Sequence, residues 1–438
     1  MTGTPRTNQV FPTLGQAAAL LIGLELPGDP LAARKLLDGK ASPELARAAI
    51  ELNALRVRAT SKMPNSDFML LTRKGLEQAT DGRVCAWRAR EIARILPDIT
   101  VHDATAGIGA ESLALAAVGQ KLLSSDRDPV HAGACKANLR ASGFPSPVLV
   151  ADARFPIFAP CVQLLDPDRR AKTGNTQSGQ QGGYASRLDP SAWSPPLSDV
   201  ARVLAQSVAG CVKLPPGVDA NEIEALLDAV APELPRRFTW TESGGDLREL
   251  CLWTGALAPE TEPARLAVRV LGGPLTSYDQ TVDKVSLPGD AGGAPDEPAM
   301  DPELCCAEDL QLKWLVEPRP SVIRAGLIGS LARSLAMAPI DPFMAYLGCT
   351  ERDVAPLDPL AKTFRVLAGT PLAKKPVRRM LKNYDIGRLT VKKRGHKASA
   401  EDLAKRFHGP GKRLGTLVVA RIGRSHRAFL VEPIPEIG

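Results

Sequence analysis

The residues best suited to chemistry in this chain are an aspartate and two closely spaced glycines near residue 105. Asp103 ends a short apolar run and precedes Gly107 by four residues, and Gly109 follows. Glycines so close together let the backbone turn sharply and let a ligand lie against the main chain. Plain turns also contain such pairs, so the glycines alone do not define a site.

The next three apolar runs also end in aspartates. Asp126 lies 19 residues after Gly107, Asp152 ends the third run and Asp166 ends the fourth. A carboxylate at the second position can accept two hydrogen bonds from ribose hydroxyls, and one at the third can reach an exocyclic adenine amine. Each aspartate could instead cap a helix or lie in a turn. Taken together, the four indicate a nucleoside-binding site.

The elements that must position these carboxylates alternate along the chain, which is typical of parallel strands joined by helices. We expect strands at 100–103, 121–126, 148–151, 162–166 and 210–214. The expected helices are 110–118, 129–141, 197–208 and 221–230. Strands at 237–242 and 248–253 flank a Ser-Gly-Gly-Asp turn at 243–246. The pattern predicts an α/β, Rossmann-like seven-stranded sheet in which one strand is reversed, with the four carboxylates at its carboxyl edge.

With 438 residues, the chain is too long for one ordinary core. Helical periodicity without strand-like alternation covers most of residues 14–97, at 17–24, 31–37, 43–60 and 85–96. Polar, glycine-rich residues 171–187 predict a flexible loop, and residues 287–302 predict a turn-rich linker. We therefore divide the chain into a helical segment (1–77), a ligand-binding domain (78–257), a linker or strand excursion (258–316) and a small α+β domain (317–438).

Charge is distributed unevenly along the chain. Between Lys362 and Arg427 there are 19 lysines and arginines and three acidic residues, a net charge of +16. The whole chain carries +7, so the remainder carries about −9. Such a segment favours a polyanionic partner, because lysine and arginine displace counterions from phosphates. A solvated surface is the alternative.

Two basic clusters stand out in this segment. Lys374, Lys375, Arg378 and Arg379 recur at helical spacing in a predicted helix at 372–383, and Lys392, Lys393 and Arg394 follow in a strand at 386–393. The other elements expected here are helices at 321–335 and 400–407, a strand at 364–367 and a hairpin of 415–422 and 427–432. Few aromatic residues interleave with the basic ones, so contacts with backbone phosphate are expected to outweigh base stacking.

The remaining composition excludes several classes of protein. The eight cysteines contain no C-x-x-C pair and are interpreted as reduced thiols, which argues against a disulfide framework or a zinc site. No signal peptide and no apolar stretch of transmembrane length is present. We expect a cytoplasmic protein without membrane contact and without a metal. The oligomeric state cannot be derived from the sequence.

Three strings resemble the first three motifs of class I S-adenosylmethionine-dependent methyltransferases. They are Asp103-Ala104-Thr105-Ala106-Gly107-Ile108-Gly109, Ser125-Asp126-Arg127-Asp128-Pro129 and Val150-Ala151-Asp152-Ala153. The resemblance implies that Asp103, Gly107 and Gly109 cradle the methionine portion of S-adenosyl-L-methionine, that Asp126 holds the ribose and that Asp152 holds the adenine. Thr80, in Gln78-Ala79-Thr80, resembles a residue that touches the methionine end; a helix cap is the alternative.

The string Asp166-Pro167-Asp168-Arg169-Arg170 lies where amine methylases carry (D/N)-P-P-(Y/F). The resemblance implies that Asp166 and Pro167 are the catalytic residues. Asp168 and Arg169 depart from the pattern, which puts methylation of a base amine in doubt. Trp193, in Trp193-Ser194-Pro195-Pro196-Leu197, could return an aromatic ring to the mouth of the pocket, or the string could simply start a helix.

The same strings, with Val212-Lys213-Leu214-Pro215-Pro216-Gly217, resemble a narrower group of bacterial methyltransferases that carry a C-terminal THUMP-like domain. Gly387-Arg388-Leu389-Thr390-Val391-Lys392-Lys393-Arg394-Gly395 is the most specific match in the tail. THUMP modules are associated with RNA binding, so the resemblance implies a structured RNA substrate, tRNA or rRNA.

Three other functions stay open at this point. A nicotinamide dehydrogenase would place its third glycine at Ser112, which departs from that pattern. The chain could bind the cofactor without catalysing a reaction, or it could methylate a small molecule or a protein while the basic tail plays no part.

Overall fold

The computed structural model describes residues 7–155, 157, 160–168, 188–272, 275–278, 280–289 and 311–436, with side chains from residue 13 onward. The predicted loop at 171–187 and most of the predicted linker at 287–302 lie outside these residues. Two compact units make up the chain, one of Met1–Glu262 with Val270–Asp283 and one of Pro263–Arg269 with Lys284–Gly438. Within the described ranges, no helix combines the length and the apolar character needed to cross a membrane.

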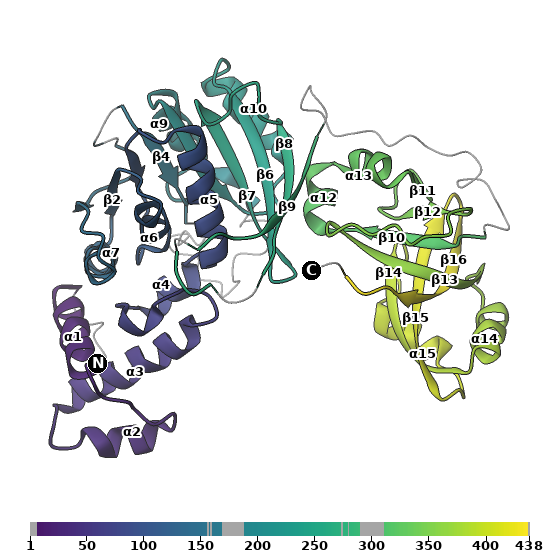
Figure 1. The fold of residues 1–438 in the computed structure, drawn as a ribbon, viewed down its shortest axis with the longest axis horizontal. Helices are drawn as coiled ribbons and strands as arrows, with labels where there is room; N and C mark the ends of the chain where they lie inside the picture. The colour runs from purple at the N-terminus through teal and green to yellow at the C-terminus, as the bar shows by residue number, and fades with distance from the viewer. Residues whose placement is uncertain are drawn as a thin grey trace, which may run out of the picture. The chain divides into compact units, whose positions relative to one another are not determined.

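The first unit begins with a series of helices, of which α1, α2 and α4 pack against α3 (Figure 1). They are α1 (Thr7–Leu20), α2 (Pro30–Leu37), α3 (Pro43–Ala59), the 3-10 turn η1 (Ser66–Phe68), α4 (Arg73–Gln78) and α5 (Gly82–Ile95). Ser42 begins α3, because its hydroxyl accepts a hydrogen bond from the backbone N–H of Leu45 at 3.2 Å. The sequence did not predict α4, a six-residue helix too short to show periodicity.

A mixed sheet follows, and the seven of its strands that lie in the first unit have the order β3-β2-β1-β4-β5-β7-β6. These strands are β1 (Val101–Asp103), β2 (Leu122–Asp126), β3 (Val148–Val150), β4 (Val162–Leu165), β5 (Ala209–Leu214), β6 (Arg236–Ser243) and β7 (Asp246–Gly255). The first five run parallel, and β7 runs antiparallel to both β5 and β6. This is the expected α/β sheet with one reversed strand.

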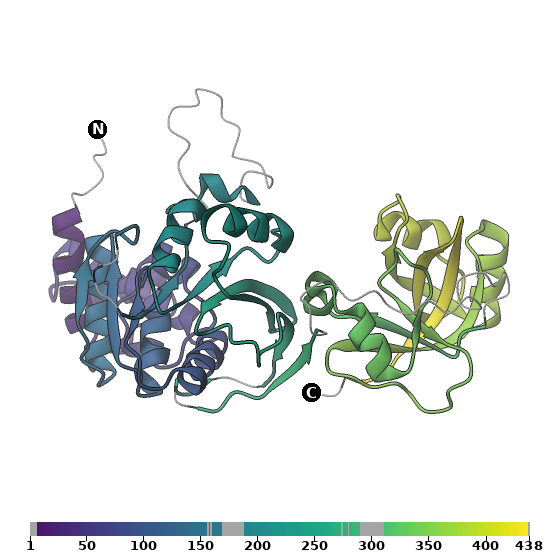
Figure 2. The same ribbon diagram turned by 90° about the horizontal axis from the view of Figure 1, so that it is seen from above.

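The connecting helices are α6 (Ala110–Ala117), α7 (Pro129–Ala141), α9 (Leu197–Ala205) and α10 (Ala220–Val230), with a 3-10 turn η2 (Pro190–Ala192) before α9. Figure 2 shows helices on both faces of the sheet. Strands covered on both faces read as continuous apolar runs, and all six residues of β5 are buried. Trp87 of α5 packs edge-to-face on Trp253 of β7, with ring centroids 6.2 Å apart.

The second unit contains a sheet in the order β11-β12-β10-β13-β16-β15-β14. Its strands are β10 (Trp314–Pro318), β11 (Ala338–Pro339), β12 (Leu347–Cys349), β13 (Ala361–Pro371), β14 (Ile386–Arg394), β15 (Arg413–Ile422) and β16 (Ser425–Pro433). The unit also includes β8 (Arg265–Val270) and β9 (Lys284–Pro288). The pair β14–β15 is parallel, whereas β15–β16 is the predicted hairpin.

The helices of this unit are α12 (Pro320–Ala325), α13 (Ile328–Leu335), α14 (Lys374–Asn383) and α15 (Ala400–Phe407). A single helix at 321–335 was the expectation, and it is wrong. Gly326 adopts a positive φ of 73°, which ends α12, and α13 begins two residues later. The sequence also did not predict the individual strands β8 to β12, which are two to six residues long.

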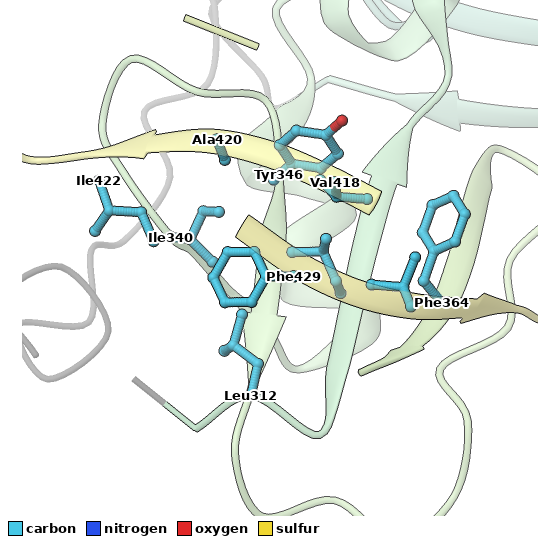
Figure 3. Packing of buried hydrophobic residues seen from close by; sticks show 10 residues of the cluster. Leu312, Ile340, Tyr346, Phe364, Val418, Ala420, Ile422 and Phe429 are labelled. Atoms are coloured by element: carbon cyan, nitrogen blue, oxygen red, sulfur yellow. The ribbon is translucent and has the colours of Figure 1, made fainter. Parts of the chain in front are cut away.

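Apolar residues cover both faces of the second sheet because side chains alternate along each strand. On one face Val418 and Phe429 pack with Tyr346 and Phe364 (Figure 3). On the other face Leu417 and Leu430 pack beneath helices α14 and α15. The basic residues of α14 are therefore displayed on a helix whose opposite side is anchored in a core.

Candidate cofactor and catalytic site

The carboxyl ends of β1 to β5 surround a cavity of about 840 Å³ in the first unit. All four predicted aspartates, at 103, 126, 152 and 166, line it together with Thr80, Gly107 and Pro167. Gly109 does not. At φ +93° it stands before α6, and a Cβ there would come within 3.3 Å of the Cα of Cys135. A glycine is therefore required at position 109 by the turn and by the packing of α6 against α7.

The glycine turn and Asp126 form one hydrogen-bonded structure. The backbone N–H of Gly107 donates to Asp126 Oδ2 at 2.9 Å, and the backbone N–H of Asp128 donates to Oδ1 at 2.8 Å. Gly107 has a φ of +55°, and no atom lies within 4 Å of the position that a Cβ would occupy. The turn therefore leaves open space against the backbone, beside a carboxylate whose orientation is fixed.

Asp103 is almost completely buried beneath the turn. Ser112 on α6 donates to Asp103 Oδ2 at 2.6 Å, and its hydroxyl also lies 2.8 Å from that of Ser124 on β2. Burial raises the pKa of Asp103 to about 7. Sequence reasoning treated Ser112 only as a departure from the dinucleotide-binding pattern. The structure gives it a role, since it fixes the carboxylate at the end of β1.

A buried network of charges forms the opposite wall of the cavity. Lys213 on β5 donates to Asp166 Oδ2 at 2.5 Å and also to Thr80 Oγ1. Its ammonium lies 3.8 Å from Glu111 Oε1, and Arg88 pairs with both Glu111 and Glu249. Lys213 thus fixes the carboxylate at the predicted catalytic position.

Ionisation in this network is set by the pairs rather than by burial. Burial by itself lowers the pKa of Lys213, but Asp166 and Glu111 outweigh it and raise that pKa above its ordinary value. Burial by itself raises the pKa of Glu111, whereas Arg88 and Lys213 hold it below its ordinary value. A lysine in the middle of an otherwise apolar strand was the sequence signal for Lys213, which carried no predicted role.

The Asp-Pro-Asp and Ser-Pro-Pro strings meet at the cavity, although Asp168 and Ser194 are 26 positions apart along the chain. Asp168 and Ser194 form a backbone bridge, with N–H to O distances of 2.8 and 2.9 Å. Arg127 donates to the Ser194 hydroxyl at 2.7 Å. Arg169 and Arg170 lie outside the described residues. Trp193 is buried and does not line the cavity, so the proposed return of an aromatic ring to the mouth is wrong.

Asp152 differs from the other three aspartates because it is partly exposed. Arg154 donates to both of its carboxylate oxygens, at 2.7 to 3.1 Å. These hydrogen bonds lower the pKa of Asp152. The side chain lines the cavity with one arginine already beside it, so it is ionised and available at the rim.

The structure divides the predicted RNA-binding residues into two groups. Lys374, Lys375, Arg378 and Arg379 are exposed on α14, whose Val377, Met380 and Leu381 are buried. In β14, Lys392 and Arg394 pair with Glu317 at 2.6 and 3.3 Å. Lys393 points to the other face of the strand and is exposed. Only the first group and Lys393 present charge directly to solvent.

Comparison with known proteins gives one match within the second unit and others over most of the chain. Residues 361–433 match the family model described as THUMP domain-like. Two uncharacterized S-adenosylmethionine-dependent methyltransferases, from two strains of Mycobacterium tuberculosis, are 29% identical over 381 residues, covering 85% of this chain and 92% of each relative.

A crystal structure from Porphyromonas gingivalis W83, described as a candidate methyltransferase, has the same fold. It superposes with a TM-score of 0.71 at 16% identity, and the match covers 99% of this chain and 100% of that one. The reversed strand, the cavity at the carboxyl edge and the C-terminal match all agree with the resemblance drawn from the motifs. The motifs, the sheet and these comparisons together support a class I S-adenosylmethionine-dependent methyltransferase with a C-terminal THUMP-like domain.

Proposed function

We propose that this methyltransferase modifies a structured RNA, tRNA or rRNA, and that its basic C-terminal unit holds the RNA while the cavity of the first unit carries out the transfer. The observation that carries the proposal is the meeting of four strand-end aspartates with a glycine turn in one cavity. The THUMP-like match and the exposed cations of α14 support RNA as the substrate. A cytoplasmic location and the absence of a metal stay predictions from the sequence.

The residues present fit S-adenosyl-L-methionine. The space over Gly107 accommodates a ligand against the backbone, and the carboxylate of Asp126 retains lone pairs for two ribose hydroxyls. We assign the adenine to Asp152 and the methionine portion to Asp103, Gly107 and Thr80. When bound, the cofactor supplies a methyl group on a positively charged sulfonium, and the acidic lining of the cavity complements that charge.

The chain's own contribution is to position the acceptor. Transfer from a sulfonium is an in-line displacement, and its catalysis consists mainly of orienting the nucleophile in a dry pocket. We assign to Asp166 the role of accepting a hydrogen bond from the N–H or O–H group that is methylated. Lys213 holds that carboxylate in place, and the backbone N–H of Asp166 donates to Thr105 Oγ1 at 2.7 Å. Pro167 has a fixed φ and restricts the backbone of Asp166 before it.

One experiment tests the proposal directly. The protein is incubated with methyl-labelled cofactor and with unmodified tRNA and rRNA, and transfer of label to each RNA is measured. We expect label in one RNA fraction and its loss in Asp166→Asn. Asp199→Asn, on the surface of α9, is the control.

The alternatives give different results in the same assay. Cofactor binding without transfer to any RNA would favour a protein that binds the cofactor but does not catalyse. Asp168 and Arg169, which differ from the amine-methylase pattern, are compatible with that alternative. Transfer to a protein or a small molecule, insensitive to salt and to RNA, would contradict the assignment of RNA as substrate.

A further inference from the structure

A second basic surface lies in the first unit, at the N-terminal helices. A groove of about 490 Å³ is lined by Arg34, Arg47, Arg58, Arg73 and Glu51 around an apolar floor of Ile50, Ala54 and Leu55. Its charged lining residues carry a net charge of +3. This surface is separate from the basic segment at the C-terminus and was not predicted from the sequence.

The groove is built from one face of α3. Arg47, Ile50, Ala54 and Arg58 recur at intervals of three and four residues, so they share one side of that helix. Arg34 enters from α2 and Arg73 from α4, and both helices pack against α3. Three helices thus converge to place four guanidinium groups around one depression.

Two of these arginines, Arg47 and Arg58, do not link the helices, whereas Arg34 donates to the carbonyl of Pro43 at the start of α3 at 3.0 Å. Arg56, on the opposite side of α3, is buried and donates its Nε to the carbonyl of Met69 at 3.0 Å, as a structural arginine does. Arg47 and Arg58 are exposed, and neither pairs with a carboxylate in the described part of the chain. Arg34 pairs with Asp38 and Arg73 pairs with Glu51, each at 3.4 Å. Both ion pairs are exposed to solvent, and such pairs contribute little to stability.

The groove adjoins the cofactor cavity through α4. Arg73 lines the groove, and the next residue, Lys74, lines the cavity together with Gly75 and Glu77 of the same helix. One short helix is therefore a wall of both. A polyanion lying in the groove would pass directly beside the entrance to the cavity.

We propose that this arginine groove, defined by Arg34, Arg47, Arg58 and Arg73, binds the phosphate backbone of the substrate RNA and holds it next to the methylation cavity. The inference rests on the proposed function. Guanidinium groups match phosphate oxygens in a bidentate geometry, and four of them around a depression favour a polyanion over a single small anion. An apolar floor without aromatic side chains favours backbone contact over base stacking.

The test uses the full chain with the double variant Arg47→Glu/Arg58→Glu. The matched control is Lys136→Glu/Arg140→Glu, which makes the same change of charge on the exposed side of α7. For each protein, binding of the RNA that the wild type methylates is measured by fluorescence anisotropy at several salt concentrations, and cofactor affinity is measured by calorimetry.

We expect the groove variant to bind that RNA at least about tenfold more weakly at 0.1 M salt, with a log–log salt slope shallower by about 1.5 to 2, as the loss of two phosphate contacts requires. Cofactor affinity should stay at the wild-type value, and the control should keep most of its RNA affinity. Wild-type RNA affinity and slope in the groove variant would overturn the proposal. Failure of the wild type to bind any RNA would instead refute the proposed function, so the two failures are distinguishable.

Discussion

The cofactor cavity and helix α14 use charge in opposite ways. Around the cavity, Lys213 and Asp103 are 6% and 1% exposed, and Arg88 is completely buried. On α14, the cations at 374, 375, 378 and 379 are all exposed, and only apolar side chains face inward. The first arrangement fixes individual groups in one orientation, whereas the second presents several cations to solvent, none of them paired with a carboxylate of the described residues.

This difference follows from the cost of desolvation. A buried ion must be paired and hydrogen-bonded, so each residue of the cavity wall depends on a specific partner. Exposed cations cost little, act additively and are screened by salt. Single substitutions should therefore have large effects in the cavity and small, cumulative effects on α14.

The largest expected effect is the loss of cofactor binding in Asp126→Ala and in Gly107→Leu. Two hydrogen bonds from ribose hydroxyls to a charged carboxylate contribute about 1.5–3 kcal/mol each, so Asp126→Ala should weaken binding at least about 100-fold. A leucine at 107 would fill the open space over the turn and strain a positive φ. Calorimetry measures both, with Asp98→Ala on the surface as control. Unchanged affinity in both variants would refute the site.

The next largest effect is expected on removing Lys213 from the buried charge network of the cavity wall. Lys213→Met leaves Asp166 and Glu111 without a shared cation, and breaking a buried pair in this way costs about 3–5 kcal/mol of stability. Methyl transfer should also fall strongly, because the acceptor carboxylate loses its orientation. Denaturant unfolding and initial rates test this. Lys62→Met is the matched control, since Lys62 donates only to the carbonyl of Leu76 among its described partners. Equal effects in both variants would contradict the assigned role.

Much of the cavity could be predicted because local signals in the first unit agree with one another. Helix α7 was predicted at 129–141 and is found there, and each aspartate lies at or just after the end of a strand that was predicted close to its observed position. Parallel topology then brings the strand ends to one edge without any knowledge of tertiary contacts.

The missing parts of the prediction depend on contacts between distant segments. Lys213 reaches Asp166 across 47 positions and Thr80 across 133, and nothing local marks such a pair. Ser112 reaches back to Asp103 only because α6 lies over β1. In the second unit, strand alternation shows that Lys392 and Lys393 face opposite sides, but only the structure shows that Glu317 occupies one of those sides.

A smaller effect should appear in the pH dependence of stability. Burial raises the pKa of Asp103 to about 7, so the folded state holds its proton more tightly than the unfolded chain does. The ionised carboxylate therefore destabilises the fold; the cost is absent below about pH 4 and complete above about pH 7, where it reaches up to about 4 kcal/mol.

Replacing this carboxylate by an amide separates stability from binding. Without cofactor, Asp103→Asn should unfold at higher denaturant concentration than the wild type at pH 8, and the difference should shrink toward pH 4. Asp152→Asn is the control, because Arg154 lowers the pKa of Asp152 and the removal of its charge should not stabilise the fold. A pH-independent difference for Asp103→Asn would contradict the assigned burial cost.

The smallest effects per residue are expected for the basic residues of the second unit, where the exposed cations of α14 can be compared with the paired cations of β14. Charge reversal of Lys374, Lys375, Arg378 and Arg379 together should make the salt slope of RNA binding shallower by about 3, with each residue contributing equally. Lys392→Ala/Arg394→Ala should change that slope less and thermal stability more, because both side chains are paired with Glu317. Filter binding over a salt series, with thermal unfolding of the same samples, separates the two outcomes. Salt-independent RNA binding would remove α14 as the docking surface, since contact with phosphate requires counterion release.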